Sequence, residues 1–406
     1  MDRSHLVTSA YREKFGSEPR VVVRAPGRVN LIGEHTDYNE GFVFPTAIDR
    51  DMIIAASPKP KPADPENEVE DREVVVYSLE YRQEDRFSLD QLEKSADHPW
   101  INYLRGTLKA LQQAGLKTQP FSAVISGNIP PGAGLSSSAA YSVATALMQR
   151  EMCGFSLPGK ELALLAQKAE NDFVGVKCGI MDPFISALGE RDAALLLDCR
   201  SLNYRTIPLP LKKEGVSIVI TNSGVPRGLV DSEYNARRQQ CQEGVELLKK
   251  ASGFDDIATL RDVVMSELEE FGSTLPPIIL KRCRHVISEN ERCIRATEAL
   301  ERGDLRAFGR LMNDSHRSLQ QDFQVSCTEL DVLVELTQNH TGVLGSRMTG
   351  AGFGGCSVTL MQTNAVETFQ NQVIPAYESH TGKKAEVYVC NSVSGAGLVN
   401  APAVAS

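Results

Sequence analysis

A glycine- and serine-rich segment, PPGAGLSSSAA over residues 130–140, most constrains how this chain can fold. Its small residues allow a tight backbone turn, and the apolar side chains that follow recur at helical spacing. Amide groups at the start of such a helix, beside three hydroxyls, predict an anion site without a lysine. The GK[ST] end of a Walker A loop is absent, so the segment is not a P-loop. A plain turn that ends in a serine helix cap is the alternative.

The pattern of apolar residues predicts a mixed α+β chain with a β-rich first half and a more helical second half. We expect strands in VVVRA, FVFPTAIDRDMIIAAS, VVVYSLEY, FSAVISG, AALLLDC, SIVITNS, SRMTG, CSVTLM and EVYVC. A first helix is expected after Ser4, with one apolar side made of Leu6, Val7, Ala10, Tyr11 and Phe15. Further helices are expected from Ala140 to a stop at Gly154, from Leu162 to Phe173, and through most of residues 200–340. The polar segment 58–72 predicts an exposed loop.

Charge, apolar runs and cysteines exclude several classes of protein. The 43 basic and 52 acidic residues give a net charge of −9, without the basic footprint of a nucleic-acid binder. No stretch of about 18 apolar residues exists that would span a bilayer, and the first residues lack a signal core. Nine cysteines without a CxxC pair indicate neither a zinc ribbon nor a disulfide framework. A reduced, cytoplasmic compartment is the simplest interpretation.

The segment GRVNLIGEHTDYN, residues 27–39, places four ionisable groups within ten residues of a loop between strand-like runs. Glu34, His35 and Asp37 could ligate a metal, or they could hydrogen-bond the hydroxyls of a sugar. The single histidine and the lack of a second ligand cluster favour the sugar. A solvated loop is the remaining alternative.

Two further carboxylates lie around the segment CGIMDP, residues 178–183. Glu170 falls at the flank of an apolar helix stripe, where a partly buried carboxylate needs a partner such as a metal ion or reaches out to water. Asp182 precedes Pro183, so it could cap a helix whose first residue is the proline. That position also points a carboxylate into the space in front of the helix.

The segment GSRMTGAGFGG, residues 345–355, contains a formal GxGxxG match at 350–355. A dinucleotide fingerprint should follow a strand and open a helix, whereas the continuation CSVTLM is strand-like. The HRD and DFG motifs that accompany a protein-kinase glycine loop are absent. We therefore interpret the segment as a turn in which two backbones approach closely.

These four segments, in this order, resemble the galactokinases of the GHMP small-molecule kinase superfamily over nearly the whole chain. WINYLRG at residue 100, TNS at 221 and SEYNARR at 232 match the same pattern. The resemblance implies an α+β fold of two lobes with the active site between them. Residues 1–200 would form the ribosomal-S5-like N-terminal lobe, and residues 201–406 the ferredoxin-like C-terminal lobe.

The resemblance further implies transfer of the γ-phosphate of ATP to the 1-hydroxyl of α-D-galactose. Asp182 would be the general base with Arg28 beside it, and Asp37 would bind the axial 4-hydroxyl. The implied roles of the other residues are sugar binding by Glu34, His35, Gly179 and Tyr234, triphosphate binding by Gly132, Gly134, Leu135, Ser136, Ser137 and Ser138, Mg²⁺ binding by Ser138 and Glu170, and approach to the adenine by Trp100 and Tyr103.

Two positions depart from the family pattern: Pro183 stands where glutamine is usual, and Ala351 where glycine is usual. Proline could change the aim of Asp182, and alanine carries a cost only if its φ is positive. Some relatives are sugar sensors that lack the small pair after the serine run, but Ala139 and Ala140 are present here. A kinase of another sugar, such as N-acetylgalactosamine or arabinose, is the other alternative. We expect a cytoplasmic monomer whose partners are galactose and ATP, not nucleic acid or membrane.

Overall fold

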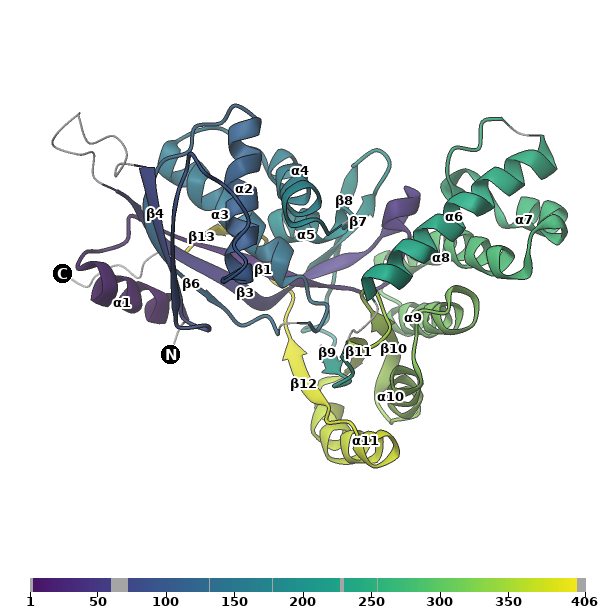
Figure 1. Cartoon of the computed structure of the whole chain (residues 1–406). Helices are drawn as coiled ribbons and strands as arrows, with labels where there is room; N and C mark the ends of the chain where they lie inside the picture. Colours follow the sequence, from purple (N-terminus) through teal and green to yellow (C-terminus); the bar gives the residue numbers. More distant parts are fainter. Residues whose placement is uncertain are drawn as a thin grey trace.

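The computed structural model describes residues 3–399 except 60–71, 131, 177, 227–229 and 254, so most of the expected loop at 58–72 lies outside the described residues. The chain forms two lobes (Figure 1). Each lobe is built on a mainly antiparallel sheet with helices against it, and a third, smaller sheet of three strands lies between them in sequence. The predicted α+β class is confirmed.

The first lobe is built on a six-stranded sheet of order β13-β1-β3-β6-β4-β5. Its strands are β1 (Val21–Asn30), β3 (Pro45–Pro58), β4 (Glu73–Ser78), β5 (Gln83–Ser88), β6 (Phe121–Gly127) and β13 (Gly397–Leu398). Helix α1 (Arg3–Phe15) packs on one face through Val7 and Tyr11. Leu6 is 46% exposed, so its expected place on the apolar side of α1 is wrong.

Four helices cover the other face of this sheet (Figure 1). They are α2 (Asn102–Gln113), α3 (Ser137–Cys153), α4 (Gly159–Lys168) and α5 (Met181–Leu188). Helix α3 ends at Gly154 in the left-handed conformation, as the sequence predicts. The predicted helix to Phe173 is α4 followed by a π-helical turn, η4 (Ala169–Val174). Helix α2 and strand β5 were not among the elements expected from the sequence.

The small sheet has the order β2-β7-β8, with β2 (Phe42–Val43), β7 (Ala193–Asp198) and β8 (Tyr204–Pro208). The β7–β8 hairpin therefore spans the expected lobe boundary at residue 200. Strand β13, from the far end of the described chain, pairs antiparallel with β1, and Val23 lies opposite Leu398. The exact division into lobes at 200 stays a prediction.

The second lobe is built on an antiparallel sheet of order β10-β11-β9-β12. Its strands are β9 (Val216–Asn222), β10 (Val343–Thr349), β11 (Cys356–Gln362) and β12 (Glu386–Cys390), and its helices are α6 (Val230–Ser252), α7 (Met265–Phe271), α8 (Pro277–Glu301), α9 (Leu305–Ser318), α10 (Thr328–Gln338) and α11 (Val366–Thr381). Short 3-10 or π turns are η1 (Asp37–Asn39), η3 (Pro99–Ile101), η5 (Leu260–Asp262), η6 (Gly272–Thr274), η7 (Leu319–Phe323) and η8 (Thr363–Ala365). The expected late strands and the helical stretch before them are confirmed.

The hydrophobic core is continuous between the lobes. A single cluster of buried apolar side chains contains residues of β1 and α3 from the first lobe and of α8, α9 and β11 from the second. Phe44 and Phe308 meet across the junction with ring centroids 6.0 Å apart. This shared core holds the two lobes at a fixed spacing, and the polar cavity described below lies between them.

None of the helices in the described ranges combines the length and the apolar character needed to cross a membrane.

Ser392 joins three parts of the fold and provides a test of it. Its buried hydroxyl lies 2.9 Å from Thr46 Oγ1, donates to the Ala193 carbonyl and accepts from the Ala193 N–H. We expect Ser392→Ala to lower the free energy of unfolding by about 1–2 kcal/mol, because buried polar groups lose a partner. Urea unfolding measures this change. The exposed neighbour Ser394→Ala is the control, and an equal effect of the two changes would contradict the assignment.

Candidate active site

A cavity of about 400 Å³ between the lobes collects the four segments that the sequence analysis singled out. Predicted site residues that line it are Arg28, Glu34, His35, Asp37, Gly132, Gly134, Leu135, Ser136, Ser137, Ser138, Glu170, Gly179, Asp182 and Tyr234. Residues that line it without having been predicted are Gly175, Val176, Cys178, Met181, Asn235, Gly350 and Ala351. Most of the latter are neighbours of the predicted residues in the same motifs, which is the signal that could have found them.

Arg28 and Asp182 form a bidentate ion pair in the middle of this cavity. Arg28 Nε and Nη2 each donate to a carboxylate oxygen of Asp182 at 2.7 Å, and Nη1 donates to the Gly134 carbonyl at 2.5 Å. Arg28 is only 5% exposed, because it lies on β1 beneath the glycine-rich loop. A planar guanidinium with two parallel donors fixes the orientation of a carboxylate. Asp182 is therefore aimed by Arg28.

Asp182 is the second residue of α5, so the alternative in which it caps that helix is wrong. The helix begins at Met181, and the flanking residue Ile180 already has right-handed helical angles. Pro183 is the third helical residue, where the missing N–H has no intrahelical partner to lose. The proline is accommodated without unwinding the turn that carries Asp182.

The glycine-rich loop leads directly into α3, as the sequence predicts. Gly27 on β1 has no room for a side chain, since a Cβ there would lie 2.5 Å from the Leu135 carbonyl oxygen. Ser136 precedes α3 with φ of 64° and makes no side-chain capping bond. Its hydroxyl donates instead to Asp182. The alternative of a serine helix cap is therefore wrong, and the first amides of α3 face the cavity without a capping side chain.

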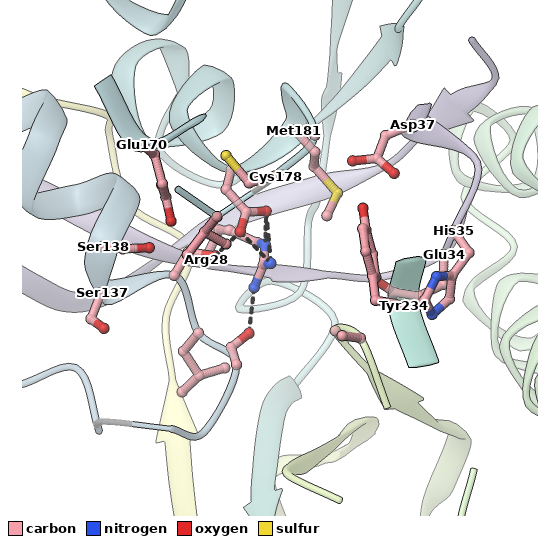
Figure 2. Close-up of a pocket in the computed structure, with 18 of the residues that line it drawn as sticks. Arg28, Glu34, His35, Asp37, Ser137, Ser138, Glu170, Cys178, Met181 and Tyr234 are labelled. Carbon is pink, nitrogen blue, oxygen red and sulfur yellow. Dashed lines mark hydrogen bonds and ion pairs between the residues drawn. The ribbon is translucent and has the colours of Figure 1, made fainter. Parts of the chain in front are cut away.

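Glu170 lies beside Ser138 on one side of the ion pair. In Figure 2, Glu170, Ser138 and Ser137 lie on one side of Arg28, and Asp37, Tyr234 and His35 lie on the other. Glu170 is 6% exposed and forms no ion pair with a basic side chain of the described residues. Burial raises its pKa from 4.5 to about 7, although a hydrogen bond from Ser138 opposes the shift. Such a carboxylate lacks a cationic partner, and a bound cation would supply one.

On the other side of the ion pair, Gly179 allows Asp37 to approach. A Cβ at Gly179 would come within 1.6 Å of Asp37 Oδ2, so any other residue there would displace the Asp37 carboxylate. Burial, and next the charge of Asp182, raise the pKa of Asp37 from 3.8 to about 6. Two acidic groups thus face one space, where they can accept hydrogen bonds from hydroxyl groups.

Rings and a buried ion pair complete this second side of the cavity. Tyr234 on α6 lies with its ring centroid 5.1 Å from Tyr38 and 5.8 Å from His35. Burial lowers the pKa of His35 to about 3, so its imidazole is neutral. Arg347 on β10 donates to Glu34 Oε2 at 2.8 Å and to the Asn30 carbonyl. Glu34 is therefore held from the second lobe.

The glycine turn between β10 and β11 brings two backbones together, as interpreted from the sequence. A Cβ at Gly352 would lie 2.1 Å from the Val325 carbonyl oxygen. Strand β11 follows the turn, which excludes the dinucleotide interpretation. Ala351 is not among the residues with positive φ, so it carries no backbone strain.

Two predicted residues lie outside the cavity lining. Trp100, in η3, stacks on Tyr81 with centroids 5.9 Å apart and donates from Nε1 to Gln83 Oε1. Tyr103 packs near Tyr141. Their expected role at an adenine stays a prediction.

Within the described ranges, no group of three or more His, Cys, Asp or Glu side chains is arranged to hold a metal ion. A cation in the cavity would therefore depend on few protein ligands.

Comparisons with known proteins agree with this architecture. Family models match at residues 9–58 (galactokinase galactose-binding signature), 102–190 (GHMP kinases N-terminal domain) and 296–379 (GHMP kinases C-terminal). A galactokinase from Roseiflexus sp. (strain RS-1) is 48% identical over 97% of this chain and 98% of its own. One from Chloroflexus aggregans is 47% identical over 97% of each.

Solved structures give the same result. The structure of Lactococcus lactis galactokinase complexed with galactose superposes with a TM-score of 0.90 at 36% identity, covering 98% of this chain and 100% of that one. Methanococcus jannaschii mevalonate kinase, at 17% identity and a TM-score of 0.63 over 93% of this chain and 100% of its own, shares the fold. With identities near one half over almost the full length, the chain belongs to the galactokinase family of the GHMP kinases.

Proposed function

We propose that the protein transfers the γ-phosphate of ATP to the 1-hydroxyl of α-D-galactose. The observation that carries the proposal is the position of the Arg28–Asp182 pair between two unlike halves of one cavity. One half offers helix amides and hydroxyls suited to phosphates, and the other offers acidic and aromatic groups suited to a sugar. A hydroxyl between the halves would lie beside Asp182.

Asp182 would accept the proton of the attacking hydroxyl. Phosphoryl transfer depends mainly on positioning and on neutralisation of charge, so the base need not be strong. Arg28 directs two donors at Asp182, which fixes the orientation of the carboxylate. Ser136 donates to the same carboxylate and links it to the loop that would hold the phosphates.

The sugar half supports discrimination between epimers. Asp37 would accept from the axial 4-hydroxyl, while Glu34, His35 and Tyr234 would contact other hydroxyls. In the epimer the 4-hydroxyl points in another direction, so the buried carboxylate of Asp37 would lose its hydrogen-bond partner. The binding of the epimer would therefore be strongly disfavoured. Gly179 contributes the space that Asp37 occupies.

The phosphate half would take ATP as its Mg²⁺ complex. Gly132, Gly134, Leu135, Ser136 and Ser137 would surround the triphosphate with backbone amides and hydroxyls. Glu170 and Ser138 would be the protein ligands of Mg²⁺, an ion that retains several waters and therefore needs few side chains. When bound, the ion would neutralise phosphate charge. Glu170 fits that role, because its buried carboxylate forms no ion pair with a basic side chain of the described residues.

The adenine would extend toward Trp100 and Tyr103, beyond the cavity lining. One chain supplies every residue of the proposed site, so we propose that a monomer suffices for activity. We also propose that the protein works in the cytoplasm.

A panel of sugars tests the function. The protein is incubated with Mg-ATP and galactose, glucose, N-acetylgalactosamine or arabinose, and the products are identified by NMR. We expect galactose 1-phosphate as the main product, because Asp37 would accept from the axial 4-hydroxyl of galactose. Galactose binding without product would indicate a sensor, and preferential phosphorylation of another sugar would replace galactose as the substrate.

Asp182→Asn tests the proposed base. The substitution keeps the shape of the side chain but removes its basic oxygen, so we expect kcat to fall about 1000-fold. The KM for ATP should change little, since the glycine-rich loop is intact. Asp172 is an exposed carboxylate in the turn η4. The variant Asp172→Asn is the control and should retain wild-type rates. A kcat of Asp182→Asn close to that of the control would rule out general-base catalysis by Asp182.

Glu170→Gln tests the cation site through pH. Because the pKa of Glu170 is raised to about 7, the native state holds a proton that the unfolded state has lost between pH 4.5 and 7. The stability that protonated Glu170 gives the wild type is therefore fully present below pH 4.5, mostly retained at pH 5 and lost by pH 8. In metal-free buffer, Glu170→Gln should gain up to about 3 kcal/mol over the wild type between these pH values.

Urea unfolding at pH 5 and pH 8 measures the Glu170 effect. Glu161→Gln, an exposed carboxylate on α4, is the matched control and should not change the pH dependence. Addition of Mg-ATP at pH 8 should stabilise the wild type more than Glu170→Gln. Equal stabilisation of the two proteins would exclude Glu170 as a cation ligand.

A further inference from the structure

Helix α8 of the second lobe holds the backbone of the sugar-side segment from residue 33 to residue 42. Three of its side chains, His285, Glu289 and Asn290, bond to main-chain groups of this segment. His285 and Glu289 are one helical turn apart, so they lie on the same face of α8. The helix has no residue in the cavity lining, which separates it from the groups that would touch substrate.

Glu289 is the centre of this contact. Its Oε1 accepts from the backbone N–H of Gly33 at 2.9 Å, from that of Glu34 at 3.3 Å and from Ser315 Oγ at 2.6 Å. Its Oε2 accepts from Arg292 Nε at 2.7 Å. The side chain is fully buried, and although burial opposes ionisation, Arg292 and the other neighbours lower its pKa to about 2.

The backbone around Glu34 has the shape of an anion-binding nest. Gly33 and His35 have φ of 88° and 62°, and the successive N–H groups of residues 33 and 34 point to one carboxylate oxygen. Buried N–H groups without an acceptor would destabilise this conformation. Glu289 supplies that acceptor, and it therefore stabilises the backbone conformation at Gly33 and Glu34.

His285 and Asn290 hold the segment at two further points. The carbonyl of Glu34 can only accept, so His285 Nε2 carries the proton and donates to it at 3.1 Å. Asn290 Oδ1 accepts from the Phe42 N–H at 3.0 Å. The absence of a side chain at Gly41 makes this approach possible, because a Cβ there would lie 2.3 Å from Asn290 Oδ1.

We propose that Glu289 is a positioning residue for sugar binding. It accepts from the backbone N–H groups of Gly33 and Glu34 and so holds the segment that presents Glu34 and His35 to the cavity. The proposal rests on the proposed function, in which Glu34 and His35 bind the sugar. The phosphate half is positioned by other elements, β1, α3 and α5. Loss of the Glu289 carboxylate should therefore weaken the binding of sugar and leave the binding of ATP unchanged.

Glu289→Gln tests the proposal in the full-length protein. The glutamine side chain has the same shape as glutamate but no charge. Its NH₂ group would face either Arg292 or the backbone N–H groups of Gly33 and Glu34, which are themselves donors. We expect the KM for galactose and the calorimetric Kd of galactose to rise about tenfold, the loss expected for a charge-assisted hydrogen bond. The KM for ATP should stay within about twofold, and kcat at saturating galactose should change little.

Thr297→Val is the matched control on the same helix. Thr297 is as buried as Glu289, but its hydroxyl donates to the Cys293 carbonyl within α8. The Thr297→Val variant should leave the KM for galactose and the KM for ATP unchanged. Ser315→Ala, which removes one donor to Glu289 Oε1 without removing the charge, should raise the KM for galactose about threefold. This variant decides the question if Glu289→Gln does not fold.

The outcomes separate the two proposals. Wild-type protein that makes no galactose 1-phosphate would overturn the proposed function. Wild-type activity together with an unchanged galactose KM in Glu289→Gln and Ser315→Ala would overturn the role of Glu289 alone. A parallel rise of both the galactose and the ATP KM would also overturn it, because a general loosening of the fold does not distinguish the two halves of the cavity.

Discussion

The site depends on one interaction, the bidentate contact between Arg28 and Asp182. An arginine that is 5% exposed needs a partner for its charge, and Asp182 satisfies two of its donors while Gly134 satisfies a third. This requirement brings β1, α5 and the glycine-rich loop to one point, although they are far apart in sequence. Ser136 adds a fourth contact. A buried arginine therefore organises the cavity, and among the described residues no lysine or second arginine lines it.

The two halves of the cavity are positioned by different means. The phosphate half is local, because the loop, α3 and the Glu170 turn belong to the same lobe as Arg28. The sugar half takes Glu34, His35 and Asp37 from the first lobe. Tyr234 comes from the second lobe, as do the supporting residues Arg347, His285 and Glu289. Burial of charged groups at this junction ties substrate recognition to the contact between the lobes. The shared hydrophobic core then fixes that contact.

Sequence patterns predicted the α+β class and most strands, since glycine turns, helix starts and alternation are local signals. The gathering of the four motifs in one site was implied only by the resemblance to galactokinases. Strand β5, with the sequence QEDRFS, was missed because its apolar content is low. The capping roles considered for Ser136 and Asp182 were wrong, since contacts with Arg28 and with each other outweigh local propensity. Glu289 could not be found at all. An acidic residue in an amphipathic helix suggests a solvated face, and only the tertiary structure brings it to Gly33.

The pairing of β13 with β1 has a consequence for how the protein is made. Strand β1 leaves the ribosome early, but its neighbour on one edge is encoded near the other end of the chain. During translation that edge stays open while the second lobe is synthesised, and an open edge can pair with strands of other nascent chains. The strand that carries Arg28 thus acquires its last neighbour late in biosynthesis.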